Sequence, residues 1–253
     1  NTEKPRRLSP RSPLSGVVGF LDRIGFLELV PYGLILLLIV GLMMLEPHMS
    51  GTILILAGAA AVLFAAGIKL YWFAGGGAAL MGLVVLMMSG YQSTRILVWQ
   101  DPWAYPRDGG YQIIQSLYAI GSGGLLGLGL GKSRQKFLYL PEPENDFIFA
   151  IVCEELGLIG AGIVLILFAL LVMRGYWIAI HARDRFGALL VVGITTLTAV
   201  QVFLNISVVT NLIPTTGISL PFFSYGGTAL MIQLAEMGII LSVSRQIPAP
   251  RQE

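Results

Sequence analysis

The feature that most constrains this chain is a run of fifty residues, Phe186–Ala235, without a single Asp, Glu, Lys or Arg. A helix that spans a bilayer needs about 20 mainly apolar residues, so this run is too long for one span. The polar and proline residues that divide it into two helices joined by an uncharged loop are Asn205, Asn211, Pro214 and Pro221. The run therefore predicts a chain that crosses a membrane more than once.

The composition points to the same class of protein. Hydrophobic residues make up 55% of the chain and charged residues 12%, whereas soluble domains carry about 25% charged residues. We therefore expect an all-α integral membrane protein. The single cysteine, Cys153, excludes a disulfide framework and a cysteine metal site. The net charge of +2 gives no reason to expect a nucleic-acid partner.

The apolar runs predict six transmembrane helices, at about residues 29–45, 50–68, 71–90, 150–174, 187–207 and 227–244. They form one polytopic domain, residues 29–253, after a basic arm at residues 1–28. A long, partly helical loop at residues 91–149 joins the third helix to the fourth. The chain starts at Asn1 without a leader-like segment, so we expect that an upstream part is missing.

The distribution of Lys and Arg predicts how these helices are oriented. Eleven of the sixteen basic residues fall on the side that carries both chain ends, and the other five fall in the loop at residues 91–149. Cytoplasmic loops carry the excess of basic residues. We therefore expect both termini in the cytoplasm and the long loop outside.

Two uncharged or glycine-rich stretches on the outward side predict a shaped cavity. Gly109–Gly131 is apolar but too broken for a normal span, so it forms either a re-entrant helix buried in protein or an interfacial helix. Leu212–Gly227, which contains Ser224 and Tyr225, has the same character.

Asp146 is the first candidate for chemistry. It follows Asn145, a favoured helix N-cap, so we expect it in the first turn of the fourth span, where an acid also complements the helix dipole. Glu154 lies eight residues further on, within about 80° of the same helical face, and Glu155 lies opposite. Acids within a span are costly and usually face a cavity or a partner. Spacing alone leaves a capping role and a chemical role open.

Basic residues bracket this acid in the sequence. Arg95, Lys132 and Lys136 stand in the same outward loop. Arg binds phosphate through two parallel hydrogen bonds, and Lys binds it as a point charge. The group suits a phosphate-bearing lipid, although each residue taken singly is also explained by a basic side chain that reaches up to the interface.

These residues resemble a known family, the shape, elongation, division and sporulation (SEDS) proteins, from about residue 30 to 246. The similar motifs are Arg95, Asp101-Pro-Trp103, Gly110-Tyr-Gln112, Gln115-Ser116, Gly127–Gly131, Leu140-Pro-Glu142, Asp146–Ala150, Glu154–Gly157 and Leu220–Gly227. Asp101-Pro-Trp, Gly129-Leu-Gly-Lys-Ser133 and Thr216-Gly-Ile look closer to the FtsW/SpoVE branch than to RodA.

The resemblance implies the C-terminal six helices of a ten-helix fold, and the chain departs from the family pattern in two places. Glu46-Pro-His-Met-Ser-Gly-Thr52 is one residue longer than the usual motif and lacks its aspartate. Asn145 stands where the family usually has Thr or Ser.

The resemblance also implies an activity: a peptidoglycan glycosyltransferase that polymerises lipid II on the outer face of the bacterial cytoplasmic membrane, for septal or spore wall synthesis. Asp146 would act as the general base that takes the proton of the GlcNAc 4-hydroxyl as it attacks C1 of MurNAc. Arg95, Lys132 and Lys136 would bind the leaving pyrophosphate with a divalent cation, Mg²⁺ or Mn²⁺, and no organic cofactor. Glu154, Glu155, Ser224 and Tyr225 complete the predicted substrate site.

The partners that the resemblance implies are lipid II, glycan linked to undecaprenyl pyrophosphate, a class B penicillin-binding transpeptidase, and other division or sporulation membrane proteins. Two alternatives are a lipid II flippase and a divisome scaffold. A flippase needs polar groups along a path between the leaflets, whereas the charge in this chain gathers at one face. The pattern favours surface chemistry.

Overall fold

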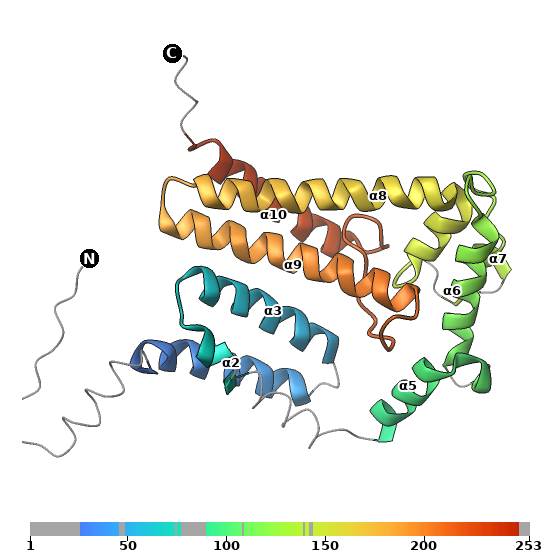
Figure 1. Ribbon diagram of the computed structural model, residues 1–253, viewed down its shortest axis with the longest axis horizontal. Coiled ribbons are helices and arrows are strands. Elements are labelled where there is room, and N and C mark those ends of the chain that lie inside the picture. The colour runs from blue at the N-terminus through green and yellow to red at the C-terminus, as the bar shows by residue number, and fades with distance from the viewer. Residues whose placement is uncertain are drawn as a thin grey trace, which may run out of the picture. The chain divides into compact units, whose positions relative to one another are not determined.

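A computed structural model describes residues 26–45, 49–73, 75–76, 90–107, 109–138, 140–141 and 144–247 of the chain (Figure 1). Most of the predicted basic arm at residues 1–28, most of the predicted span at 71–90 and the Glu46–His48 segment lie outside these residues. The chain divides into two compact units, residues 1–52 and 53–253. All the predicted site residues belong to the second unit.

Every regular element among the described residues is a helix, which confirms the predicted all-α class. The elements are α2 (Phe26–Leu45), α3 (Met49–Ala65), α5 (Gly90–Gln100), the 3₁₀ helix η1 (Pro102–Ala104), α6 (Gly110–Gly123), α7 (Gln135–Leu138), α8 (Ile148–His181), α9 (Arg185–Val209) and α10 (Gly227–Ser244).

Three of these helices, α8, α9 and α10, are long and apolar enough to cross a membrane. Leu29–Met43 and Ser50–Ala65 are apolar helical stretches of shorter length. The protein is therefore a multi-pass membrane protein. The fifty-residue uncharged run divides as expected into α9 and the start of α10, with the irregular segment 210–226 between them.

The long helices pack side by side. Figure 1 shows α9 returning alongside α8, and α10 crossing the pair. The turn between α8 and α9 is fixed by Asp184, whose carboxylate accepts a hydrogen bond from the Gly187 N–H and so caps α9. The apolar cluster that joins the three helices at this end consists of Ile178, Ala179, Val191, Ile194, Ile240 and Val243.

Helix α8 is broken at Gly157, a feature that the sequence did not predict. Gly157 has φ +68° and ψ −172°, a conformation that is essentially restricted to glycine. A side chain there would also collide with backbone, because a Cβ atom would lie 2.3 Å from the Gly127 nitrogen. The break separates a short helix, Ile148–Leu156, from a long one that starts at Leu158, and Figure 1 shows the short part turned away from the long axis.

The break leaves backbone groups without helical partners, and the glycine-rich segment after α6 supplies them. Leu128 and Gly129 N–H donate to the carbonyls of Glu154 and Glu155, at 2.9 and 3.0 Å. In return, Leu158 and Ile159 N–H donate to Gly124 and Leu125 carbonyls, at 2.9 and 3.2 Å. A membrane protein tolerates irregular backbone only where such groups are satisfied. The stretch predicted to be irregular therefore forms α6 followed by a strap that closes the break.

Candidate active site

Asp146 lies in a turn just before α8, not in its first turn as predicted. The helix begins at Ile148, and Phe147 occupies the N-cap position without a side-chain cap. The carboxylate of Asp146 borders the segment between α9 and α10, because a Cβ atom on Gly217 would lie 3.4 Å from Asp146 Oδ2. Gly217 has φ +71°, a left-handed conformation that favours glycine. A turn and an irregular segment therefore meet at the predicted base.

Asn205 of α9 fixes the main chain at this point. Its Nδ2 donates to the carbonyl oxygens of Asp146 and Ile218, both at 2.7 Å. The side chain is 1% exposed, and its Oδ1 has no hydrogen-bond partner among the described residues. A buried acceptor without a partner destabilises a fold by about 1–3 kcal/mol. The two donated hydrogen bonds to main-chain carbonyls offset this cost, since each satisfies a carbonyl oxygen. Sequence reasoning used Asn205 only as a divider of helices and missed this role.

The segment Asn211–Tyr225, which we call the support loop, holds the residues before Asp146. The Ser224 hydroxyl donates to the Asn145 carbonyl at 2.6 Å and accepts from the Leu220 N–H at 2.7 Å. The Tyr225 N–H donates to the Glu144 carbonyl at 2.8 Å. The Ser224 hydroxyl is thus engaged within the protein, while the Tyr225 side chain is 79% exposed. These are the two loop residues that the sequence singled out.

The opposite side of the support loop contacts α5. Arg95 donates from Nη1 to the Thr215 carbonyl at 3.1 Å. Trp99 donates from Nε1 to the Asn211 carbonyl at 3.1 Å, and the Asn211 amide donates back to the Trp99 carbonyl at 3.4 Å. Arg95 and Asp146 are 51 positions apart in the sequence, and both contact the support loop, at Thr215 and Gly217.

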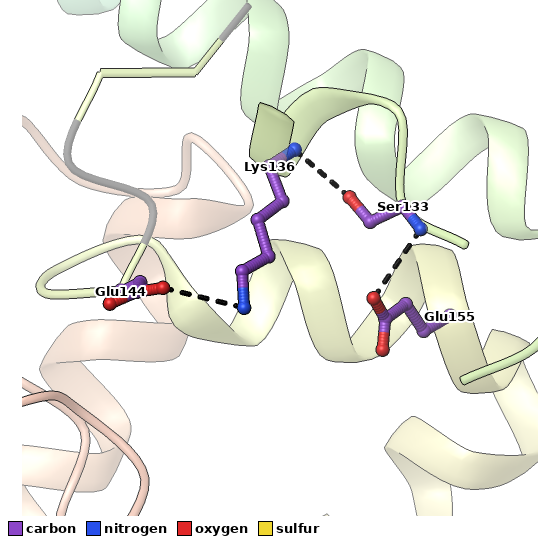
Figure 2. Close-up of polar contacts among 4 residues, drawn as sticks. All are labelled: Ser133, Lys136, Glu144 and Glu155. Atoms are coloured by element: carbon purple, nitrogen blue, oxygen red, sulfur yellow. Dashed lines mark hydrogen bonds and ion pairs between the residues drawn. The ribbon is translucent and has the colours of Figure 1, made fainter. Parts of the chain in front are cut away.

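Glu154 and Glu155 both reach Ser133, rather than opposite surroundings as the helical spacing predicted. The Ser133 hydroxyl and the Arg134 N–H donate to the Glu154 carboxylate, the latter at 3.1 Å. The Ser133 N–H donates to Glu155 Oε1 at 3.3 Å (Figure 2). The prediction measured both angles from Asp146, which lies before α8; neighbouring helix residues are only about 100° apart, so one segment reaches both carboxylates. Glu154, 1% exposed, anchors the basic segment to α8.

Lys136 is directed toward the segment that carries Asp146. Its N–H donates to Ser133 Oγ at 3.0 Å, and its Nζ lies 3.3 Å from Glu144 Oε1 (Figure 2). Glu144 is two residues before Asp146. Lys132 is exposed, and its N–H donates to the Gly129 carbonyl at 3.1 Å, so it belongs to the strap that closes the helix break.

The arrangement joins a carboxylate to cationic groups at one end of the three long helices. Asp146 is held through its main chain by Asn205 and the support loop, Arg95 by the same loop, and Lys136 by the Ser133 contacts. Such a site suits the activation of a hydroxyl beside an anionic leaving group. Among the described residues, no group of three or more His, Cys, Asp or Glu side chains is placed to hold a metal ion.

A helical membrane protein with a carboxylate and basic residues at one end of its bundle is the class that these observations define. A family model described as cell cycle protein, FtsW/RodA/SpoVE, matches residues 24–248. The chain belongs to this family, which confirms the SEDS resemblance.

Two relatives agree with the predicted branch. Stage V sporulation protein E of Bacillus subtilis (strain 168) is 50% identical over 206 residues, which cover 81% of this chain and 56% of that protein. A probable peptidoglycan glycosyltransferase FtsW of Geobacter sp. (strain M18) is 44% identical over 219 residues, 86% of this chain and 60% of the relative. The chain thus spans less than two thirds of the length of these relatives.

Solved structures share the fold. One is described as "Structural coordination of polymerization and crosslinking by a peptidoglycan synthase complex"; it has a TM-score of 0.69 and 31% identity, over 86% of this chain and 62% of that one. The rod shape determining protein RodA of Thermus thermophilus has a TM-score of 0.57 and 27% identity, over 86% and 56% of the two chains.

Proposed function

We propose that the protein is a peptidoglycan glycosyltransferase that polymerises lipid II into glycan strands. The observation that carries the proposal is the placement of Asp146: its main chain is clamped by Asn205 and its carboxylate borders Gly217, between segments that bear Arg95 and Lys136. The relatives named as probable peptidoglycan glycosyltransferases supply the reaction class.

In the proposed reaction, Asp146 accepts the proton of the GlcNAc 4-hydroxyl. That oxygen forms a bond to C1 of the MurNAc at the end of the growing strand, and the C1–oxygen bond to undecaprenyl pyrophosphate breaks with its electron pair. A single displacement inverts C1. General-base catalysis supplies about 10²–10⁴-fold, so positioning by Asn205 and the support loop must supply a large part of the remaining acceleration.

The leaving pyrophosphate is the group that the cationic residues would bind. Arg95, Lys132 and Lys136 are proposed for this role, with Tyr225 as an exposed ring for the substrate. We place Glu154, Glu155 and Ser224 behind them as positioning residues, since their polar atoms bind other protein segments. A divalent cation, Mg²⁺ or Mn²⁺, stays a proposal. Mg²⁺ often binds through one or two carboxylates and substrate phosphates, and we route no step through it.

We also propose where the site faces and what it works with. The excess of basic residues at the other side of the helices supports an outward-facing site on the cytoplasmic membrane of a bacterium, with both chain ends inside. The solved peptidoglycan synthase complex supports a class B penicillin-binding transpeptidase as partner. Other division or sporulation membrane proteins are further proposed partners.

The test is polymerisation of lipid II by the complete protein, purified with its transpeptidase partner. We expect Asp146→Asn to lower the rate of glycan synthesis by about 10²–10⁴-fold while the protein still melts normally and copurifies with its partner. Synthesis by this variant at the wild-type rate would remove Asp146 from the role of base. A variant that fails in synthesis but moves lipid II across vesicles at the wild-type rate would separate the polymerase from the transport alternative.

A further inference from the structure

The main chain and the side-chain ammonium of Lys136 are held by different kinds of contact. Its N–H donates to Ser133 Oγ, and Ser133 is bound by both Glu154 and Glu155. The main chain of Lys136 is thus fixed to buried groups. Its ammonium, in contrast, reaches the surface, and among the described residues its one ion pair is with Oε1 of Glu144, at 3.3 Å (Figure 2).

The ion pair between Lys136 and Glu144 is one in which another anion can replace the Glu144 carboxylate at low cost. The two side chains are 36% and 52% exposed, and ion pairs between exposed groups contribute little net stability. A Lys ammonium has three donors, so it can bind more than one oxygen of an incoming anion. If the pair opened, Glu144 would return to water rather than stay as an unpaired buried charge, which is the situation that makes breaking an ion pair costly.

The location of the pair matters as much as its weakness. Glu144 is held through its carbonyl by the Tyr225 N–H, and it precedes Asp146 by two residues. An anion that replaced the Glu144 carboxylate would therefore lie beside the segment that carries the proposed base. A pyrophosphate brings several oxygens and more negative charge than one carboxylate, so it is the better partner for Lys136.

We propose that Glu144 is an internal anion that occupies Lys136 until the pyrophosphate of the lipid-linked substrate replaces it. The proposal rests on the proposed function and adds a residue to it. The empty site then keeps a satisfied lysine, and Glu144 sets how tightly substrate and product pyrophosphate bind.

The experiment compares Glu144→Gln with wild type in the complete protein with its partner. We expect the KM for lipid II and the inhibition constant of inorganic pyrophosphate to fall by about two- to fivefold, the range that a partly exposed ion pair supports. Lys136→Ala should raise both constants, and Glu144→Gln should have no further effect in the Lys136→Ala background. Glu144→Asp, which keeps the charge but shortens the reach, is the matched control and should lie between wild type and Glu144→Gln.

The sign of the effect decides between exchange and a merely structural pair. A pair that only stabilises the loop predicts higher constants in Glu144→Gln, and that result overturns the proposal, as does no change. If Glu144→Gln lowers both constants equally in the Lys136→Ala background, the effect comes from the negative charge of Glu144 alone and not from its pair with Lys136. That result also overturns the proposal. The inhibition constant of inorganic pyrophosphate measures binding of the free anion, and the KM for lipid II measures binding of the lipid-linked pyrophosphate.

Failure of the proposed function is recognised separately. A wild-type protein that makes no glycan would overturn the polymerase, whatever Glu144 does. Binding of inorganic pyrophosphate to the detergent-solubilised protein, measured by calorimetry, then still decides the exchange: tighter binding by Glu144→Gln supports it, and unchanged or weaker binding overturns it.

Discussion

At the scale of single residues, Asn205 has the most specific role in this site. One amide nitrogen joins the carbonyls of Asp146 and Ile218, which belong to segments on either side of α9 in the sequence. The side chain has no acidic or basic group, and it donates to the main-chain carbonyl of Asp146. We therefore treat it as a positioning residue, whose loss should change the geometry of the proposed base rather than the binding of substrate.

We expect Asn205→Leu, which keeps a similar volume but removes both donors, to lower kcat by about ten- to hundredfold, since each lost hydrogen bond is worth about 1 kcal/mol and strands a carbonyl. The KM for lipid II should change by less than about threefold, because the cationic residues stay in place. The measurement is steady-state polymerisation together with thermal unfolding in detergent.

The matched control for Asn205 is Thr198→Val. Thr198 is also buried on α9, and its hydroxyl donates to the Ile194 carbonyl one turn earlier, within the same helix. We expect this variant to keep both kinetic constants. A rise in KM with unchanged kcat in Asn205→Leu would show that Asn205 serves substrate binding instead of the base.

At the scale of elements, the break in α8 sets the direction of its short part, Ile148–Leu156, which leads from the site. It depends on one residue conformation and on four backbone hydrogen bonds to the strap at residues 124–129. The same strap runs on to Lys132 and Ser133. The helix break and the basic segment are therefore parts of one structural unit.

Gly157→Ala should destabilise the protein severely, because alanine is strained at φ +68° and its Cβ would lie 2.3–2.6 Å from backbone atoms of Leu125 and Gly127. We expect a loss of at least about 4 kcal/mol, which corresponds to about 8–16 °C in the melting temperature of a chain of this size. Thermal unfolding in detergent measures it.

Gly162→Ala provides the internal comparison for this prediction. Gly162 lies in the long part of α8, and an added Cβ would meet nothing within 4 Å. Alanine is the better helix former by about 1 kcal/mol, so we expect an unchanged or slightly higher melting temperature. Equal melting temperatures for the two variants would mean that the break does not hold the fold together.

The sequence predicted the elements of this site better than their connections. Apolar runs and charge placement gave the helical membrane class and the division of Phe186–Ala235, and the role of Asp146 stays a prediction. The break at Gly157 could not be predicted, because the residues after Glu155 read as one continuous apolar helix and the groups that satisfy the break lie about thirty residues upstream. The role of Asn205 was missed because it joins two carbonyls that lie 59 and 13 positions away in the sequence.

At the scale of the whole molecule, the long part of α8 places two turns on opposite sides of the membrane. From Leu158 to His181 it is about 36 Å long at 1.5 Å per residue, enough to cross a hydrocarbon core of about 30 Å. The segment with Ser133 and Arg134 lies at one end of this helix, and the turn with Arg183 follows its other end.

The proposed orientation predicts which turn is reached from outside the cell. In a Cys153→Ala background, which removes the single and buried native cysteine, we expect Arg134→Cys to react with a membrane-impermeant maleimide on spheroplasts. We expect Arg183→Cys, also at an exposed position, to react only after permeabilisation. The reverse pattern would put the site in the cytoplasm and exclude the proposed reaction on the outer face.

Four of the contacts that assemble the support loop share one direction, with a consequence for sequence variation. Side chains donate and main-chain carbonyls accept: Arg95 to Thr215, Trp99 to Asn211, Asn205 to Ile218, and Ser224 to Asn145. Any residue supplies a carbonyl, so the accepting positions are open to substitution as far as these contacts require, and the donating positions are not. Asn145 can therefore replace the Thr or Ser usual in the family without losing the contact to Ser224. In this site, positions whose side chains donate hydrogen bonds should tolerate few substitutions, and positions that only offer a main-chain carbonyl should tolerate many, whatever their distance from the reacting groups.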